Sequence, residues 1–143
     1  MTISDHEQKI LQAIREKKCQ HIIQVHAFEK QKDGIFTIME LAKSLDLNQM
    51  YDKIGACLQM AKGVSELEQL GFFHRDLKPD NFVIGEDGKI KLIDFGIKKQ
   101  NLTQTNTAAI GTFLYMAPDM IISTNYDSSV DIWSSGVIFY EVQ

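Results

Sequence analysis

Apolar residues recur along the chain at two spacings, and these spacings predict helices and strands. Spacings of three and four residues predict helices at 5–18 and 51–70, and a short helix is expected at 45–50. The stripe in the second of these helices is expected to be buried and consists of Ile54, Cys57, Leu58, Ala61, Val64, Leu67 and Leu70. Residues 131–140 are apolar on nearly every side, which is typical of a helix inside a protein.

Two pairs of short apolar runs predict antiparallel hairpins. The runs are 22–28, 35–39, 82–84 and 90–93. Turn residues at 32–34 separate the first pair, and turn residues at 85–88 separate the second. Residues 97–116 show little periodicity, which is typical of a surface loop. No internal repeat or linker divides the chain, so the pattern predicts one unit of the α+β class.

The composition narrows the class of protein. The chain has 143 residues, of which 44% are hydrophobic and 24% charged, and both values are ordinary for a globular protein. The net charge of −4 argues against a nucleic-acid-binding surface. Cys19 and Cys57 fit neither a disulfide framework nor a zinc site. The polar N-terminus and the lack of a long apolar run predict an intracellular protein, cytoplasmic or nuclear, with no membrane partner.

The hairpin expected at 82–93 places two polar residues at neighbouring strand ends. Asn81 comes directly before its first strand, and Asp94 comes directly after its second. Because these two ends lie side by side in a hairpin, both side chains can aim at one point. Amide and carboxylate oxygens suit a hard cation, so this geometry meets the requirement of a shared metal site.

The strongest chemical signal is the stretch 74–81, which reads HRDLKPDN. Thirteen positions after Asn81 the residues 94–96 read DFG, and residues 117–119 read APD. In this order and at these gaps, the three stretches resemble the H-R-D-L-x-x-x-N catalytic loop, the D-F-G element and the A-P-E element of the eukaryotic protein kinases. The lysine within the catalytic loop, Lys78, is typical of the Ser/Thr-directed branch of that family.

The resemblance implies a partial protein-kinase-like α+β fold. Residues 1–41 would be a remnant of the small β lobe, with the family's C helix and its fourth and fifth strands. Residues 42–143 would be the hinge and the first part of the mainly helical C-terminal lobe, stopping in the central F helix. We expect the chain to be about half of a kinase domain, truncated at both ends, with apolar surface exposed at both.

The same resemblance implies a reaction. It implies phosphoryl transfer from ATP to a Ser or Thr hydroxyl of a protein substrate, with ATP and Mg²⁺ as cofactors. Asp76 would be the catalytic base, and Lys78 would reach the γ-phosphate. Asn81 would complete the catalytic set, and Asn81 and Asp94 would be the metal ligands.

A nucleotide site follows from the resemblance as well. Met39 would be the gatekeeper beside the adenine pocket, and the backbone at Glu40 and Ala42 would bond the ring. The other residues in contact with the cofactor would be Lys78, Asn81 and Asp94. Glu7 would be the C-helix glutamate that pairs with the phosphate-binding lysine of the family's third strand.

Further residues would support and regulate this site. Four would stack as the family's regulatory spine, anchored by Asp131, and these are Leu11, Val25, His74 and Phe95. Arg75 would pair with a phosphate that an upstream kinase adds to Thr107 or, as second choice, to Thr105. Thr112 would bond the catalytic loop and favour Ser/Thr over Tyr specificity.

The chain departs from the family pattern in places. No stretch resembles the Gly-rich loop, no residue takes the position of the third-strand lysine, and Asp119 replaces the glutamate of A-P-E. Three interpretations stay open. The chain is an incomplete record of an active Ser/Thr kinase, or it is a non-catalytic kinase-like binding or scaffold protein, or it is an unrelated α+β domain that matches the motifs by coincidence.

Overall fold

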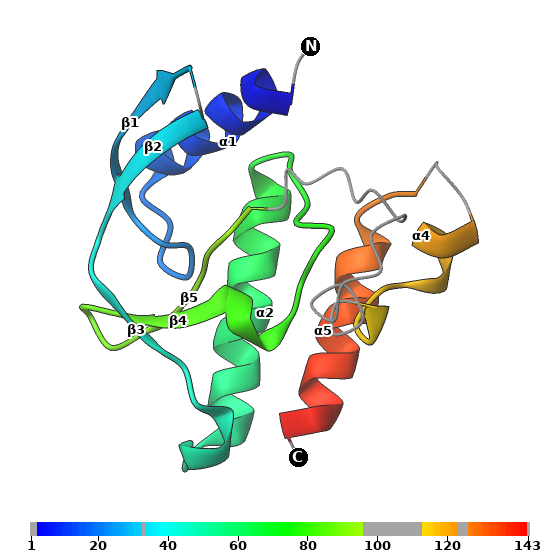
Figure 1. The fold of residues 1–143 in the computed structure, drawn as a ribbon. Helices are drawn as coiled ribbons and strands as arrows, with labels where there is room; N and C mark the ends of the chain where they lie inside the picture. The colour runs from blue at the N-terminus through cyan, green and yellow to red at the C-terminus, as the bar shows by residue number, and fades with distance from the viewer. Residues whose placement is uncertain (1–2, 33, 96–112, 123–125, 143) are drawn as a thin grey trace.

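The computed structural model describes residues 3–32, 34–95, 113–122 and 126–142, and Figure 1 shows the chain as a ribbon. The helices are α1 (Ile3–Lys17), α2 (Lys53–Gln69), α4 (Pro118–Ile122) and α5 (Ser129–Val142), with 3-10 turns η1 (Leu47–Gln49) and η2 (Pro79–Asn81). The strands are β1 (Val25–Gln31), β2 (Gly34–Met39), β3 (Ala42–Ser44), β4 (Phe82–Gly85) and β5 (Ile90–Leu92). The helices and strands expected from the periodicity are confirmed to within a few residues, whereas β3 and α4 were not expected.

The strands form two separate antiparallel sheets. β1 and β2 pair with each other, and β3, β4 and β5 form a second sheet in that order. Glu40 and Leu41 are the whole connection between the two sheets, because β2 ends at Met39 and β3 begins at Ala42. β3 aligns Ala42 with Gly85, so the connection runs directly onto the edge of the second sheet.

Helix α2 has clear capping at both ends. The carboxylate of Asp52 accepts the N–H of Gly55 at 2.8 Å and begins the helix. At the other end, Gly71 adopts a φ of 83° and donates its N–H to the carbonyl of Glu68 at 2.8 Å. This left-handed conformation favours glycine and ends the helix, as the sequence indicated.

The expected buried stripe of α2 is wrong in part. The side chain of Ile54 is 84% exposed and that of Leu58 is 56% exposed. Val64 and Leu67 are buried as expected, and the other buried residues of the helix are Ala56, Met60 and Gly63. Gly63 explains the rotation, because a Cβ there would lie 2.5 Å from the carbonyl oxygen of His21. The helix therefore turns its glycine face toward the main chain of a segment more than 40 positions earlier, a contact that periodicity cannot predict.

The short segment 20–23, which follows α1, is bonded to strand β5 and to helix α2. Ile23 donates its N–H to the carbonyl of Leu92 at 3.0 Å, and Leu92 donates to the carbonyl of His21 at 2.9 Å. The carboxylate of Glu66 on α2 accepts the N–H groups of Gln20 and His21 at 3.2 and 2.8 Å. The C-terminal end of α1 is thus fixed to both β5 and α2.

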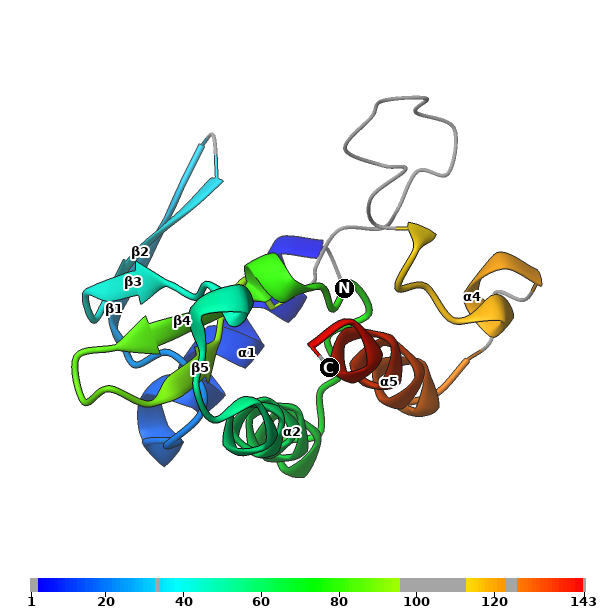
Figure 2. The same ribbon diagram turned by 90° about the horizontal axis from the view of Figure 1, so that it is seen from below.

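Helices α2 and α5 lie side by side and run in opposite directions (Figures 1 and 2). α5 buries Val130, Ile138 and Val142, whereas Ile132 and Tyr140 are 63% and 79% exposed. The face toward α2 is buried, and the exposed apolar residues on the opposite face agree with the expectation of exposed apolar surface in this part of the chain. None of the helices in the described ranges combines the length and apolar character needed to cross a bilayer.

Candidate active site

The catalytic-loop stretch begins on a buried carboxylate. Asp131, at the start of α5, is 2% exposed, and its two oxygens accept the N–H groups of His74 at 2.5 Å and Arg75 at 2.8 Å. Burial raises the pKa of Asp131, and the two N–H donors oppose that rise. Arg75 has a φ of 68°, an unfavourable backbone conformation for this residue type. The twin bonds to Asp131 hold the loop in that conformation.

The His74 side chain links two functional segments. It is fully buried, its Nε2 lies 3.0 Å from the carbonyl oxygen of Ile93, and its Nδ1 accepts the N–H of Asp76 at 3.3 Å. Because Nδ1 accepts a bond, the ring proton lies on Nε2 and is donated to Ile93. Burial lowers the pKa of His74, which favours this neutral form.

Asn81 lies where η2 meets β4 and is 3% exposed. Its side-chain Oδ1 accepts the N–H of Lys78 at 3.0 Å, and its main-chain carbonyl accepts the N–H of Ile93 at 2.8 Å. Ile93 is therefore bonded on one side to Asn81 and on the other to His74. The next residue, Asp94, has a φ of 55° and is exposed. The expected proximity of Asn81 and Asp94 at neighbouring strand ends is confirmed for the backbone.

The oxygen donors present fit a hydrated cation better than a closed protein cage. Among the residues that the structure describes, no group of three or more His, Cys, Asp and Glu side chains could hold a metal ion. Asn81 and Asp94 offer one amide and one carboxylate. Mg²⁺ typically takes one or two such ligands and completes its shell with water and phosphate oxygens. The pair therefore suits an ion that arrives with a phosphate ligand.

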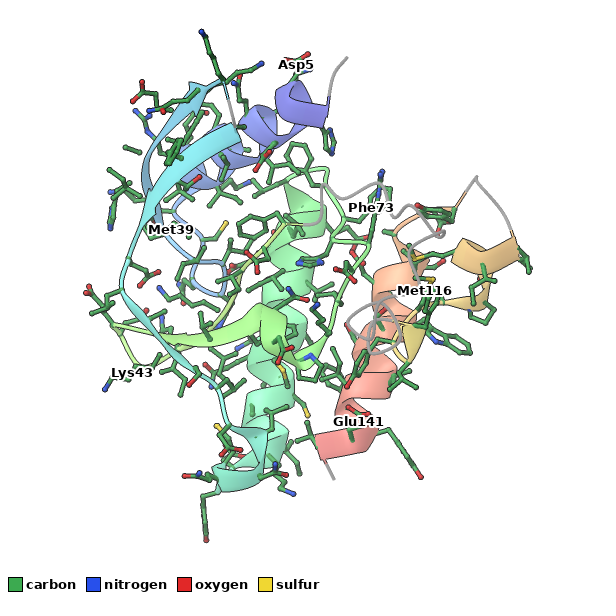
Figure 3. The ribbon with its side chains drawn as sticks, in the orientation of Figure 1. Asp5, Met39, Lys43, Phe73, Met116 and Glu141 are labelled. Carbon is green, nitrogen blue, oxygen red and sulfur yellow. The ribbon has the colours of Figure 1, made fainter. Side chains whose placement is uncertain are left out.

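Side-chain bonds hold the connection between the two sheets, which begins directly after Met39, labelled in Figure 3. Met39 is 44% exposed at the end of β2. The next residue, Glu40, donates its N–H to the carbonyl of Gln24 at 3.0 Å, and its carboxylate accepts the N–H of Gln24 at 2.8 Å. Lys91 on β5 places its Nζ 2.7 Å from the same carboxylate oxygen.

A protein kinase domain model matches residues 2–143. The chain belongs to the protein kinase family. Its fold is accordingly a partial protein-kinase-like α+β fold.

Named relatives agree with this assignment. The Ser/Thr-protein kinase pakG of Dictyostelium discoideum is 32% identical over 152 aligned residues, covering 97% of this chain. Human Ser/Thr-protein kinase ULK3 is 34% identical over 148, covering 94%, and mouse sperm motility kinase 3A is 36% identical over 120, covering 76%. The alignments span only 13%, 30% and 24% of the lengths of these three proteins.

The four residues expected to stack as the regulatory spine are all buried in this chain. Leu11, Val25 and Phe95 belong to one apolar core, and His74 is enclosed beside it. Glu7 lies half-buried on α1, and burial raises the pKa of its carboxyl. Within the described ranges, the Glu7 carboxylate makes no ion pair.

Two contacts in this kinase fold were not expected from the sequence. Tyr115 donates its hydroxyl to Glu141 at 2.7 Å, and its carbonyl accepts from the hydroxyl of Ser134 at 2.6 Å, so the stretch before A-P-D is fastened to α5. The other is the Glu40–Lys91 pair. A lysine between two apolar residues of a short strand is unusual, and the position of Lys91 in the sequence was therefore the one signal that could have indicated this ion pair.

Other sequence expectations for the kinase site lie outside the described residues. These are the expectations for Gly96, Thr105, Thr107 and Thr112. Arg75 is described, and its guanidinium lies 4.3 Å from the centre of the Phe73 ring and 6.0 Å from that of Tyr126. Asp119, in the first turn of α4, is exposed.

Proposed function

We propose that the protein transfers the γ-phosphoryl group of Mg-ATP to a Ser or Thr hydroxyl of a protein substrate. The observation that carries the proposal is the pair of bonds at Ile93, one to Asn81 and one to His74. Through them, the segment that ends in Asp94 and the loop that holds Asp76 form one rigid unit. Phosphoryl transfer depends mainly on such positioning, together with neutralisation of phosphate charge.

Each polar residue of the unit has a role in this proposal. Asp76 orients the substrate hydroxyl and accepts its proton, and Lys78 offsets charge on the γ-phosphate. Both side chains are half-buried, so they combine a fixed backbone with access to a ligand. Asn81 and Asp94 hold Mg²⁺, which supplies charge neutralisation to the phosphates when bound. The amide of Asn81 is already oriented by Lys78, and its second lone pair can serve the ion.

The adenine ring is proposed to bind at the connection between the sheets. Glu40 and Ala42 would bond it through backbone groups, beside Met39. The carbonyl of Glu40 accepts no hydrogen bond from any residue that the structure describes, which supports its use as an acceptor for the ring. In this proposal residues 1–41 serve as part of the small lobe and 42–143 as the hinge and part of the large lobe.

Regulation and location form part of the same proposal. An upstream kinase would phosphorylate Thr107 or Thr105, and the exposed Arg75 would pair with the phosphate. ATP is available inside cells, and the free thiols of Cys19 and Cys57 are compatible with a reducing compartment, so we place the reaction in the cytoplasm or nucleus.

The proposal is tested with protein expressed from the complete coding sequence. Radiolabelled phosphate transfer from Mg-[γ-³²P]ATP to a mixed protein substrate is measured, followed by acid hydrolysis of the product. Label on phosphoserine or phosphothreonine supports the proposal. A protein that neither transfers phosphate nor binds Mg-ATP would contradict the proposal.

A non-catalytic binding or scaffold function is the second candidate. One observation favours it, namely the exposed apolar face of α5 with Ile132, Trp133 and Tyr140. The same experiment separates the two, because a scaffold would form a stable complex through this face while the complete protein transfers no phosphate.

A further inference from the structure

Lys91 is the least expected buried residue in the chain. It is 5% exposed as a residue, and its side chain and that of Glu40 are only 7% and 8% exposed. Burying two charges is costly, and an apolar pair of the same size often gives equal stability. Stability alone therefore does not account for an ion pair at this position.

The geometry shows what the pair holds in place. Glu40 is half of the two-residue connection between the sheets, and Lys91 is in the middle of β5, on the far side of β4. The lysine stem crosses β4 above Gly85, where a Cβ would lie 2.6 Å from Cε of Lys91 and 3.0 Å from Oε2 of Glu40. Gly85 thus leaves the space through which the lysine reaches the connection.

A single carboxylate oxygen of Glu40 links three segments of the chain through hydrogen bonds. Oε1 of Glu40 accepts from Nζ of Lys91 at 2.7 Å and from the N–H of Gln24 at 2.8 Å, while the N–H of Glu40 is donated to the carbonyl of Gln24. Asp87 lies 3.4 Å from the same Nζ and supports its position from the turn side. With the N–H and Oε1 of Glu40 both engaged, its carbonyl is the main-chain group of this residue that remains for a ligand.

We propose that Lys91 is a positioning residue for the nucleotide, which acts by locking Glu40 so that the backbone of residues 40–42 presents a fixed edge to the adenine ring. The inference rests on the proposed function, since it assigns how that function's base-binding segment is held. Without the lysine, the carboxylate loses its cation and the connection gains freedom to turn its carbonyl away from the ring. Asp76 and Lys78 belong to the catalytic loop, a different segment. Asp94 follows Ile93, whose bonds to Asn81 and His74 do not involve Lys91, so the phosphate-transfer residues keep their geometry.

The test replaces Lys91 by Met in protein from the complete coding sequence. Lys91→Met keeps the apolar stem and removes the charge. The Michaelis constant for ATP should rise about tenfold or more, the equivalent of one well-formed hydrogen bond, with kcat changed by less than about threefold. Amide hydrogen exchange at Leu41 and Ala42 should accelerate in parallel.

The matched control is Lys89→Met in the turn directly before β5, because the Nζ of Lys89 bonds, among the residues that the structure describes, only to the exposed side chain of Gln20. Its Michaelis constant for ATP should equal the wild-type value. If Lys91→Met does not fold, Glu40→Gln/Lys91→Met removes both charges together and should still raise the constant by about fivefold.

The outcomes separate the two levels of the proposal. A folded Lys91 variant with the ATP constant and exchange rates of Lys89→Met would overturn the positioning role and leave the kinase proposal intact. A wild-type protein that neither binds nor uses Mg-ATP would overturn both. A rise in the ATP constant with unchanged kcat supports both.

Discussion

The imidazole Nε2 of His74 donates to the carbonyl oxygen of Ile93 over 3.0 Å, and this bond joins the catalytic loop to the residue before Asp94. Replacing His74 by Phe keeps an aromatic ring in the buried space but removes both hydrogen bonds of the imidazole. We expect the free energy of unfolding to fall by about 1–3 kcal/mol, because the N–H of Asp76 and the carbonyl of Ile93 lose a partner. Urea unfolding measures this. His26→Phe, at an exposed position of β1, should change little, and equal losses in the two variants would contradict the bridging role.

Asp76→Asn should abolish phosphate transfer while Mg-ATP binding stays within about threefold of wild type. A general base typically contributes about 10²–10⁴ in rate, and an amide cannot accept the hydroxyl proton. Transfer kinetics and equilibrium nucleotide binding give the two quantities. Glu86→Gln is the control, since it removes an exposed carboxylate from the nearby turn between β4 and β5. Near-normal turnover in the Asp76 variant would exclude this residue as the base.

Gly63→Ala should lower the free energy of unfolding by about 1–3 kcal/mol, the range for overpacking. The added methyl would meet the main-chain carbonyl of His21, which cannot rotate away because its oxygen is bonded to Leu92. Gly136→Ala is the matched control, because a Cβ at this position in α5 meets nothing within 4 Å. In a helix interior that change should stabilise by about 0.5–1 kcal/mol. Opposite signs for the two variants are the expected result in urea unfolding.

Tyr115 predicts a sensitivity to alkali. Burial, followed by the hydrogen bond to Glu141, raises the pKa of Tyr115 to about 12 from the ordinary 10.0. A folded-state pKa above the unfolded value means that the stabilising contribution is complete below pH 10.0 and is lost as the pH rises toward 12. The difference in unfolding free energy between wild type and Tyr115→Phe should shrink over this window. Tyr140→Phe, at a site 79% exposed, should show no such trend, and parallel curves for all three proteins would refute the assignment.

The residues proposed for the chemistry could be predicted from the sequence because the protein kinase motifs fix their types and the gaps between them. Asp76, Asn81 and Asp94 lie at fixed intervals along one loop and one hairpin. The hairpin pattern alone therefore predicted that Asn81 and Asp94 lie at neighbouring strand ends. Helix α2 shows the opposite case. Its apolar residues permit more than one buried face, and the choice is made by the approach of His21 to Gly63, which no local pattern contains.

Neither strand β3 nor the Glu40–Lys91 ion pair could be predicted from the spacing of apolar residues. Strand β3 has three residues, too few to show a period, and exists because Ala42 and Ser44 align with β4. The Glu40–Lys91 pair joins positions 51 apart. The charges of the two residues are evident from the sequence, but their burial depends on how the two sheets pack around the connection at Glu40.

The attachment of the segment 20–23 to Leu92 and Glu66 defines a pivot for α1. The segment after its C-terminal end is fixed by hydrogen bonds of its main chain, and at a rise of about 1.5 Å per residue Glu7 lies about 15 Å from Lys17. A swing of about 10° would therefore move Glu7 by about 3 Å while leaving Lys17 almost stationary. Any change in the tilt of α1 about this attachment would thus be largest at the Glu7 carboxylate.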